Sequence, residues 1–211
     1  ETAFLPIFEK TEPMTKEQEI AWTKAGQMLY AESGITTAQE GATHLPQMET
    51  IKRASDAGVN IIDVVAYPFI TDVDKILVEF PKTEWGKYNK GFKVGGVKIT
   101  IDGSPQGKTA FFSKPYLTGG PGGEESWYGE LTFPQEMVKK VYEMNVPLLL
   151  HCNGDASIDA FLTAYENARS GDFSRPWNVT TIHSQFMRKD QMPKFVKYNV
   201  RPSFYTLHTY Y

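Results

Sequence analysis

The sequence has too few residues of several kinds to belong to some common protein classes. Its single cysteine, Cys152, cannot form a disulfide within the chain. The 22 basic and 25 acidic residues give a net charge of -3, so there is no excess of positive charge for nucleic acid or an anionic membrane. No apolar run approaches the roughly 20 residues that a membrane-spanning helix needs. These absences argue against nucleic acid and membrane partners.

The composition is otherwise that of a globular protein. Hydrophobic residues make up 41% and aromatic residues 13% of the 211 residues, which is enough for a sizeable core. The sequence starts without an initiator methionine and ends on aromatic residues, in the range 203–211. Both ends are therefore expected to be cut from a longer protein. The missing signal peptide then leaves the compartment open, with the cytoplasm favoured.

Segments with helical spacing alternate with short apolar runs that end in glycine, aspartate, histidine or proline. A capping box at Thr15 and Gln18 marks the start of the first helix. The pattern predicts helices at 15–33, 46–57, 72–80, 134–144, 156–168 and 189–198. It predicts strands at 35–40, 59–67, 97–102, 146–151, 179–183 and 200–205.

Six strand–helix units in tandem predict an α/β protein whose strands pair in parallel through right-handed crossovers. An open doubly wound sheet and a closed (β/α)8 barrel both fit this order. The barrel is favoured because chemically active residues recur at the carboxyl ends of successive strands, where barrel sites lie. The expectation is one domain, 1–211, that is a fragment of a TIM-type (β/α)8 barrel and covers about strands 2 to 7.

The four histidines lie near the ends of predicted strands. His151 and His183 each close an apolar strand, His44 lies just past one, and His208 lies just past the last. Histidine is a common loop residue, but two at the ends of successive parallel strands point into a shared mouth. Neutral imidazoles in that position suit the ligation of a zinc-type metal ion.

Lys98 lies in the middle of the predicted strand 97–102. A lysine on a buried parallel strand is costly unless it is paired or chemically altered. Two structural explanations are an ion pair to Asp102 or to a loop carboxylate, and a side-chain tip that reaches solvent. The functional alternatives are a nucleophile or base with a lowered pKa, and a lysine that carries a carbamate and bridges two metals.

Two aspartates end or follow predicted strands and lie within the short motifs 102–104 and 151–155. Asp102 precedes a glycine, which is typical of a turn, and Asp155 is placed to cap the next helix. Cys152 is interpreted as a small packed residue on the opposite side of its strand from His151. The long segment 103–129 is rich in glycine and proline, and we interpret it as a flexible active-site loop that covers the mouth.

These motifs resemble amidohydrolase family 3, the branch of the metal-dependent amidohydrolase superfamily that includes N-substituted formamide deformylases. The resemblance rests on the segments 97–104, 151–155 and 181–183, and the segment 34–41 looks like the second barrel strand of the family. It implies hydrolysis of a non-peptide C–N bond, amide or N-formyl, in a small organic substrate. In the family, metal-bound hydroxide attacks the carbonyl and an aspartate on the eighth strand shuttles the proton.

The resemblance also implies a role for five residues. Lys98 matches the catalytic fourth-strand lysine that is carboxylated to bridge two metals. His151 and His183 match ligands of the second metal, and His208 and Asp155 are taken as substrate-binding residues. The implied cofactor is one or two divalent metal ions, with zinc preferred.

The sequence departs from the family pattern in ways that keep other readings open. The first-strand His-x-His and the eighth-strand aspartate are missing, and Cys152 and Asn153 replace a commoner Ala-Ile pair. The chain alone is therefore expected to be inactive, with a companion segment or a second copy completing it. The alternatives are a catalytically dead barrel that serves as a ligand-binding or assembly module, and a metal-free Schiff-base barrel that depends on Lys98 alone.

Overall fold

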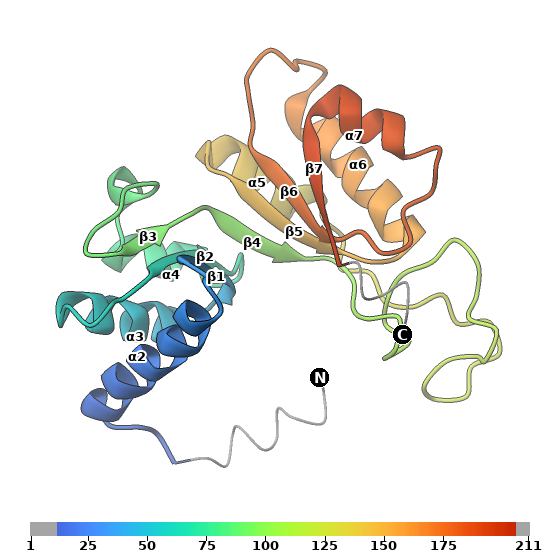
Figure 1. The fold of residues 1–211 in the computed structure, drawn as a ribbon. Coiled ribbons are helices and arrows are strands. Elements are labelled where there is room, and N and C mark those ends of the chain that lie inside the picture. Colours follow the sequence, from blue (N-terminus) through green and yellow to red (C-terminus); the bar gives the residue numbers. More distant parts are fainter. Residues whose placement is uncertain (1–11, 206–211) are drawn as a thin grey trace. The chain divides into compact units, whose positions relative to one another are not determined.

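The computed structural model describes residues 12–205, so His208 lies outside the described residues. The chain divides into two compact units, Glu1–Gly96 and Val97–Tyr211 (Figure 1). Each unit contains one sheet whose strands all pair in parallel, with helices in the connections. The predicted alternation of helices and parallel strands is therefore confirmed in both units.

The first unit is built on a three-stranded sheet in the order β1-β2-β3. Helix α2 begins after Thr15, whose hydroxyl accepts from the Gln18 N–H while the Gln18 side chain bonds back to Thr15, as the capping box predicts. The elements in chain order are α2 Lys16–Glu32, β1 Thr37–Thr43, α3 Leu45–Asp56, β2 Asp63–Pro68, α4 Val73–Glu79, a 3-10 turn Lys82–Glu84 and β3 Phe92–Val94. Its core gathers Met48, Ala66, Ile76, Phe80, Phe92 and Val94.

The second unit is built on a four-stranded sheet in the order β4-β5-β6-β7, with consecutive strands as neighbours. The elements in chain order are β4 Val97–Thr100, α5 Gln135–Met144, β5 Leu148–Cys152, α6 Asp155–Arg169, β6 Val179–His183, α7 Met192–Tyr198 and β7 Val200–Phe204. One face of this sheet carries Ile99, Leu150 and Thr181 in register, and all three are fully buried. The opposite face carries Lys98 and His151.

Strand β3 was not predicted, because three residues are too short for a periodic pattern to show. It pairs with β2, and β4 pairs with β5, so Gly95 and Gly96 separate two strands that join different sheets. A side chain at Gly95 would lie 2.7 Å from Val65 Cγ1, which explains why the chain has glycine at this point. Several strand boundaries also differ from prediction, most in the first unit, where β1 runs through Gly41 to Thr43 and β2 begins only at Asp63.

Residues 101–134 contain no helix or strand, as predicted for the loop 103–129. The loop is held by bonds within itself: the Phe112 N–H donates to the Tyr128 carbonyl at 2.8 Å, and the Tyr116 N–H donates to the Trp127 carbonyl at 2.7 Å. Gly129 has φ +95°, and a side chain there would meet the Ala110 carbonyl oxygen at 1.8 Å. The loop therefore has a defined internal bonding pattern.

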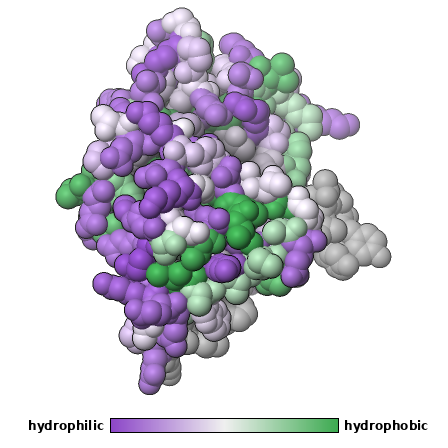
Figure 2. Space-filling model, turned by 60° about the vertical axis from the view of Figure 1, so that its left-hand side comes forward, coloured by the Kyte–Doolittle hydropathy of each residue, from purple (hydrophilic) through white to green (hydrophobic). Residues whose placement is uncertain are grey.

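The surface drawn in Figure 2 is largely hydrophilic, with apolar residues gathered in one area near its middle. Several large apolar side chains in residues 12–205 are well exposed, among them Trp22, Leu29, Val78, Leu117, Phe133 and Val196. No helix in this part of the chain combines the length and the apolar character that crossing a membrane would require.

Candidate active site at the carboxyl edge of the four-stranded sheet

The strand register places Lys98 and His151 on one face of the sheet of the second unit. Thr100 pairs with His151, and Lys98 lies two residues before Thr100 on the same strand. Cys152 therefore points to the opposite face, where it is fully buried with its Sγ 3.9 Å from Ser184 Oγ. This agrees with its interpretation as a packed residue.

The two predicted histidine ligands lie side by side. The ring centroids of His151 and His183 are 4.8 Å apart, with an angle of 76° between the ring planes. His183 ends β6 with φ 71°, and Ser184 follows with φ 46°, so the backbone leaves the extended conformation at this residue. The two imidazoles thus meet although the register aligns His151 with Ile182.

Burial sets the charge of both His151 and Lys98. It lowers the pKa of His151 to about 4, helped by the nearby positive charges of Lys98 and His183. The side chain is therefore neutral at pH 7, which is the form that binds a metal. Burial also lowers the pKa of Lys98, which is 6% exposed, to about 8.

The ion pair between Lys98 and Asp102, one structural explanation for the buried lysine, is not formed. Asp102 accepts hydrogen bonds from the backbone N–H groups of Phe111 at 3.1 Å, Asn153 at 2.9 Å and Gly154 at 2.8 Å. Burial raises the pKa of Asp102 in spite of these donors. The carboxylate joins the loop 103–129 to the turn that follows β5, which is more than the simple turn role that the sequence indicated.

Asn153 was not singled out in the sequence, yet it contacts a predicted ligand directly. It is 2% exposed, its Nδ2 donates to the Gly103 carbonyl at 2.9 Å, and the same nitrogen lies 3.1 Å from His151 Nε2. Its Oδ1 is buried and has no hydrogen-bond partner among residues 12–205. Asn153 thus fixes one edge of the His151 ring. The replacement of the commoner Ala-Ile pair at 152–153 was the only sequence signal for it.

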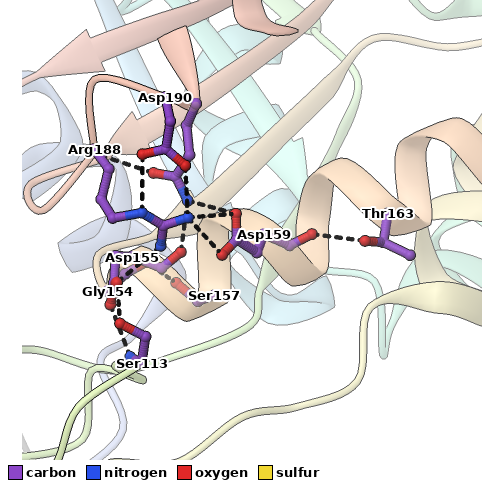
Figure 3. A network of polar contacts seen from close by, with 9 residues as sticks. Ser113, Gly154, Asp155, Ser157, Asp159, Thr163, Arg188 and Asp190 are labelled. Atoms are coloured by element: carbon purple, nitrogen blue, oxygen red, sulfur yellow. Dashed lines mark hydrogen bonds and ion pairs between the residues drawn. The ribbon is translucent and has the colours of Figure 1, made fainter.

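Asp155 is at the centre of a polar network rather than at a helix cap (Figure 3). The N-cap of α6 is Gly154, and no side chain caps that end, so the predicted capping role of Asp155 is wrong. One Asp155 oxygen accepts from the Ser113 N–H at 2.9 Å, and the other accepts from the Ser113 hydroxyl and from Arg188 Nη1 at 2.8 Å. Arg188 also pairs with Asp159 and Asp190.

Replacing Asp155 with asparagine is expected to lower the free energy of unfolding by about 1–2 kcal/mol at pH 7. Burial raises the pKa of Asp155, but its bonds to Ser113 and Arg188 outweigh burial and hold the pKa below its usual range. A carboxyl group with a lowered pKa stabilises the fold above its unfolded pKa of about 3.9. This stabilisation is lost as the pH falls through the folded value.

Urea unfolding of wild type and Asp155→Asn at pH 7 and pH 3 measures this difference, which should shrink at the lower pH. Asp190→Asn is the control, because the Asp190 side chain is 69% exposed and its pair with Arg188 is screened by solvent. An equal effect of the two substitutions would show that burial of the pair is unimportant.

The donors on this edge suit a divalent metal in part. Two imidazoles side by side and a buried amine on the neighbouring strand are the residue types that such a site uses. In the described part of the chain, no three histidine, cysteine, aspartate or glutamate side chains lie close enough together to hold an ion. The described residues thus do not form a complete set of such ligands. His208, the remaining predicted site residue, lies outside the described range.

Comparison with known proteins identifies the family to which this chain belongs. A family model described as the amidohydrolase family matches residues 1–211, and the chain belongs to that family. The resemblance found in the sequence is thereby confirmed. No curated protein matches the chain.

Two solved structures share the fold, and both are described as uncharacterized metal-dependent hydrolases. The one from Pyrococcus furiosus has a TM-score of 0.74 and 20% identity, covering 94% of this chain and 40% of the other. The one from Pyrococcus horikoshii OT3 has a TM-score of 0.72 and 22% identity, covering 90% of this chain and 37% of the other. The chain thus spans about 40% of their length. The predicted α/β fold, a fragment of a TIM-type barrel, is confirmed.

Proposed function

We propose that the complete protein is a metal-dependent amidohydrolase that cleaves a non-peptide C–N bond, amide or N-formyl, in a small organic molecule. The observation that carries this proposal is the contact between the His151 and His183 rings on the edge that also bears the buried Lys98. Family membership and the metal-dependent hydrolases of similar fold support it.

In this proposal the chain supplies the ligands of one metal. His151 and His183 bind the ion, zinc for preference, through neutral imidazole nitrogens. The bound metal supplies a Lewis acid for the carbonyl oxygen and a water of lowered pKa. Asn153 and the Gly103 carbonyl orient the His151 ring through its Nε2 edge. The remaining ligands and the proton-shuttling acid are proposed to come from parts of the protein beyond this chain.

The proposed role of Lys98 is to carry a carbamate that bridges two metals. A neutral amine is the form that reacts with carbon dioxide, forming the N–C bond and releasing a proton. With a pKa of about 8, about a tenth of Lys98 is neutral at pH 7, whereas an ordinary lysine is almost wholly charged. His208 is proposed to contact the substrate directly. Asp155 is proposed to act on the substrate through Ser113 and Arg188, because both of its oxygens already accept hydrogen bonds from these residues.

Metal analysis of the complete protein tests the proposal. His151→Ala and His183→Ala are each expected to lose at least half of the bound metal and to lower amide hydrolysis at least a hundredfold. His44→Ala is the matched control, because His44 is exposed and pairs with Asp72 in the first unit. Unchanged metal content and activity in both site variants would refute the proposal. A complete wild-type protein with neither bound metal nor amide hydrolysis would favour a barrel that only binds a ligand or assembles.

A further inference from the structure

A pocket of about 640 Å³ opens within the second unit. This volume is within the usual range for small-molecule sites. Its walls come from the loop 103–129, from the first residue of α6 and from the segment after β6. These three segments follow β4, β5 and β6, the strands that carry Lys98, His151 and His183, so the pocket lies at the same edge of the sheet.

Direct contacts connect the pocket wall to His151. The Phe186 N–H donates to the Asn153 carbonyl at 2.9 Å, and Asn153 Nδ2 lies 3.1 Å from His151 Nε2. The Gly103 carbonyl, at the start of the loop, lies 3.5 Å from the same ring nitrogen. A molecule in the pocket is therefore held by segments that also position the His151 ring.

The pocket walls are mainly aromatic and aliphatic. The Phe112 ring stands edge-on to Tyr116 at 5.1 Å and to Phe186 at 4.8 Å between centroids. Phe186 is 44% exposed and Leu117 is fully exposed, so both present apolar surface to whatever enters. An aryl ring or a branched alkyl group fits such walls by edge-to-face contact and by release of water.

Two of the three charged groups on the wall, Asp155 and Arg188, are already bound by other residues. Arg188 is bound by Asp155, Asp159 and Asp190, and its bonds to these carboxylates raise its pKa above the usual range. Asp155 in turn is bound by Ser113 and Arg188. Neither group is available to a charged ligand, which leaves the exposed Lys114 as the other charge on the wall.

We propose that this pocket binds an uncharged aryl or branched-alkyl substituent of the substrate, with the hydrolysable bond directed toward His151 and His183. The inference rests on the proposed function, because it assigns the substrate class of the same site. It makes Phe186 and Leu117 residues that determine specificity. The chemistry of bond cleavage does not depend on them.

The test compares three probes in the complete protein: N-phenylacetamide, N-methylacetamide and 4-acetamidobenzoate. Wild type is expected to prefer N-phenylacetamide over both others by at least tenfold in kcat/KM. Phe186→Ala and Leu117→Asp are each expected to lower kcat/KM for the phenyl substrate tenfold or more and to lower it much less for the methyl substrate, so that the preference for the phenyl group is lost. Leu117 is fully exposed, so its replacement leaves the packing intact.

Phe133→Ala is the matched control, because Phe133 is 81% exposed and does not line the pocket. Binding of N-phenylacetamide, followed by saturation-transfer NMR, gives a readout that does not need turnover. Binding that Leu117→Asp abolishes, without hydrolysis of any probe, supports the pocket and refutes amide hydrolysis. Hydrolysis with equal preference in all variants, a preference for the carboxylated probe, or no binding at all overturns the pocket proposal.

Discussion

Replacing Lys98 with methionine in the complete protein is expected to lower kcat/KM for hydrolysis about a thousandfold. Methionine has a similar length and suits a buried strand, but it has no amine to be carboxylated. The loss corresponds to the several kcal/mol of transition-state stabilisation that a correctly held metal supplies. Steady-state kinetics together with metal content measures it, and a variant that keeps a tenth of the activity would contradict the role of Lys98.

The same substitution is expected to stabilise the metal-free fold at pH 7, which separates the catalytic role from a structural one. Folding lowers the pKa of Lys98 from its usual value of about 10.4 to about 8, a penalty of about 3 kcal/mol for the charged form below pH 8. Between these two values the unfolded state binds more protons, so wild-type stability rises with pH. Lys98→Met lacks that rise.

Urea unfolding of the metal-free protein at pH 7 and pH 9.5 detects this difference. Lys93→Met is the control, because Lys93 lies over the Tyr88 ring at 4.2 Å and belongs to the first unit, whereas His151 and His183 belong to the second. This control substitution should leave both the activity and the pH dependence of the unfolding free energy unchanged. A Lys98→Met protein that is less stable than wild type at pH 7 would show that the lysine is held by favourable contacts.

Gly154→Ala is expected to give the largest loss of stability of any single methyl addition in the turn after β5, about 2–4 kcal/mol. A Cβ at this position would lie 1.8 Å from the Phe111 carbonyl oxygen and 2.5 Å from its carbon. The backbone at Gly154 has φ -72° and ψ 152°, which any residue adopts, so the cost comes from the clash alone. The clash also pushes apart the Gly154 and Phe111 amides that bind Asp102.

The thermal midpoint of unfolding should fall by roughly 5–15 °C for this change in a chain of this size. Gly171→Ala is the matched control in the same unit, because it has open space around the added methyl and bears only the strain of φ +79°. It is expected to cost about 1 kcal/mol. Equal losses for the two variants would show that the loop moves freely away from Gly154.

The positions of the candidate ligands were predictable from sequence because parallel strands place their carboxyl ends at one edge. His151 and His183 needed only a strand assignment and this rule. The partners of Asp102, Asp155 and Arg188 were not predictable in the same way. Asp155 meets Ser113 across 42 residues and Arg188 across 33, and such contacts leave no periodic signal.

Strand β3 shows the same limit at a smaller scale. Its three residues follow a turn and precede Gly95, and only the pairing of Val64 with Phe92 and Ala66 with Val94 defines it. In the sequence alone, Lys93 and its neighbours look like a polar loop that leads into β4. Short strands depend on tertiary pairing rather than on local preference.

The way in which Asp102 is bound has a consequence for how enzymes of this kind diversify. Its carboxylate accepts hydrogen bonds from the main-chain N–H groups of Phe111, Asn153 and Gly154. Every amino acid except proline has such an N–H group. The side chains of the loop 103–129 can therefore change without removing the backbone hydrogen bonds that hold the loop to Asp102. Selectivity for new substrates can therefore arise by substitution of those side chains while His151 and His183 keep their positions.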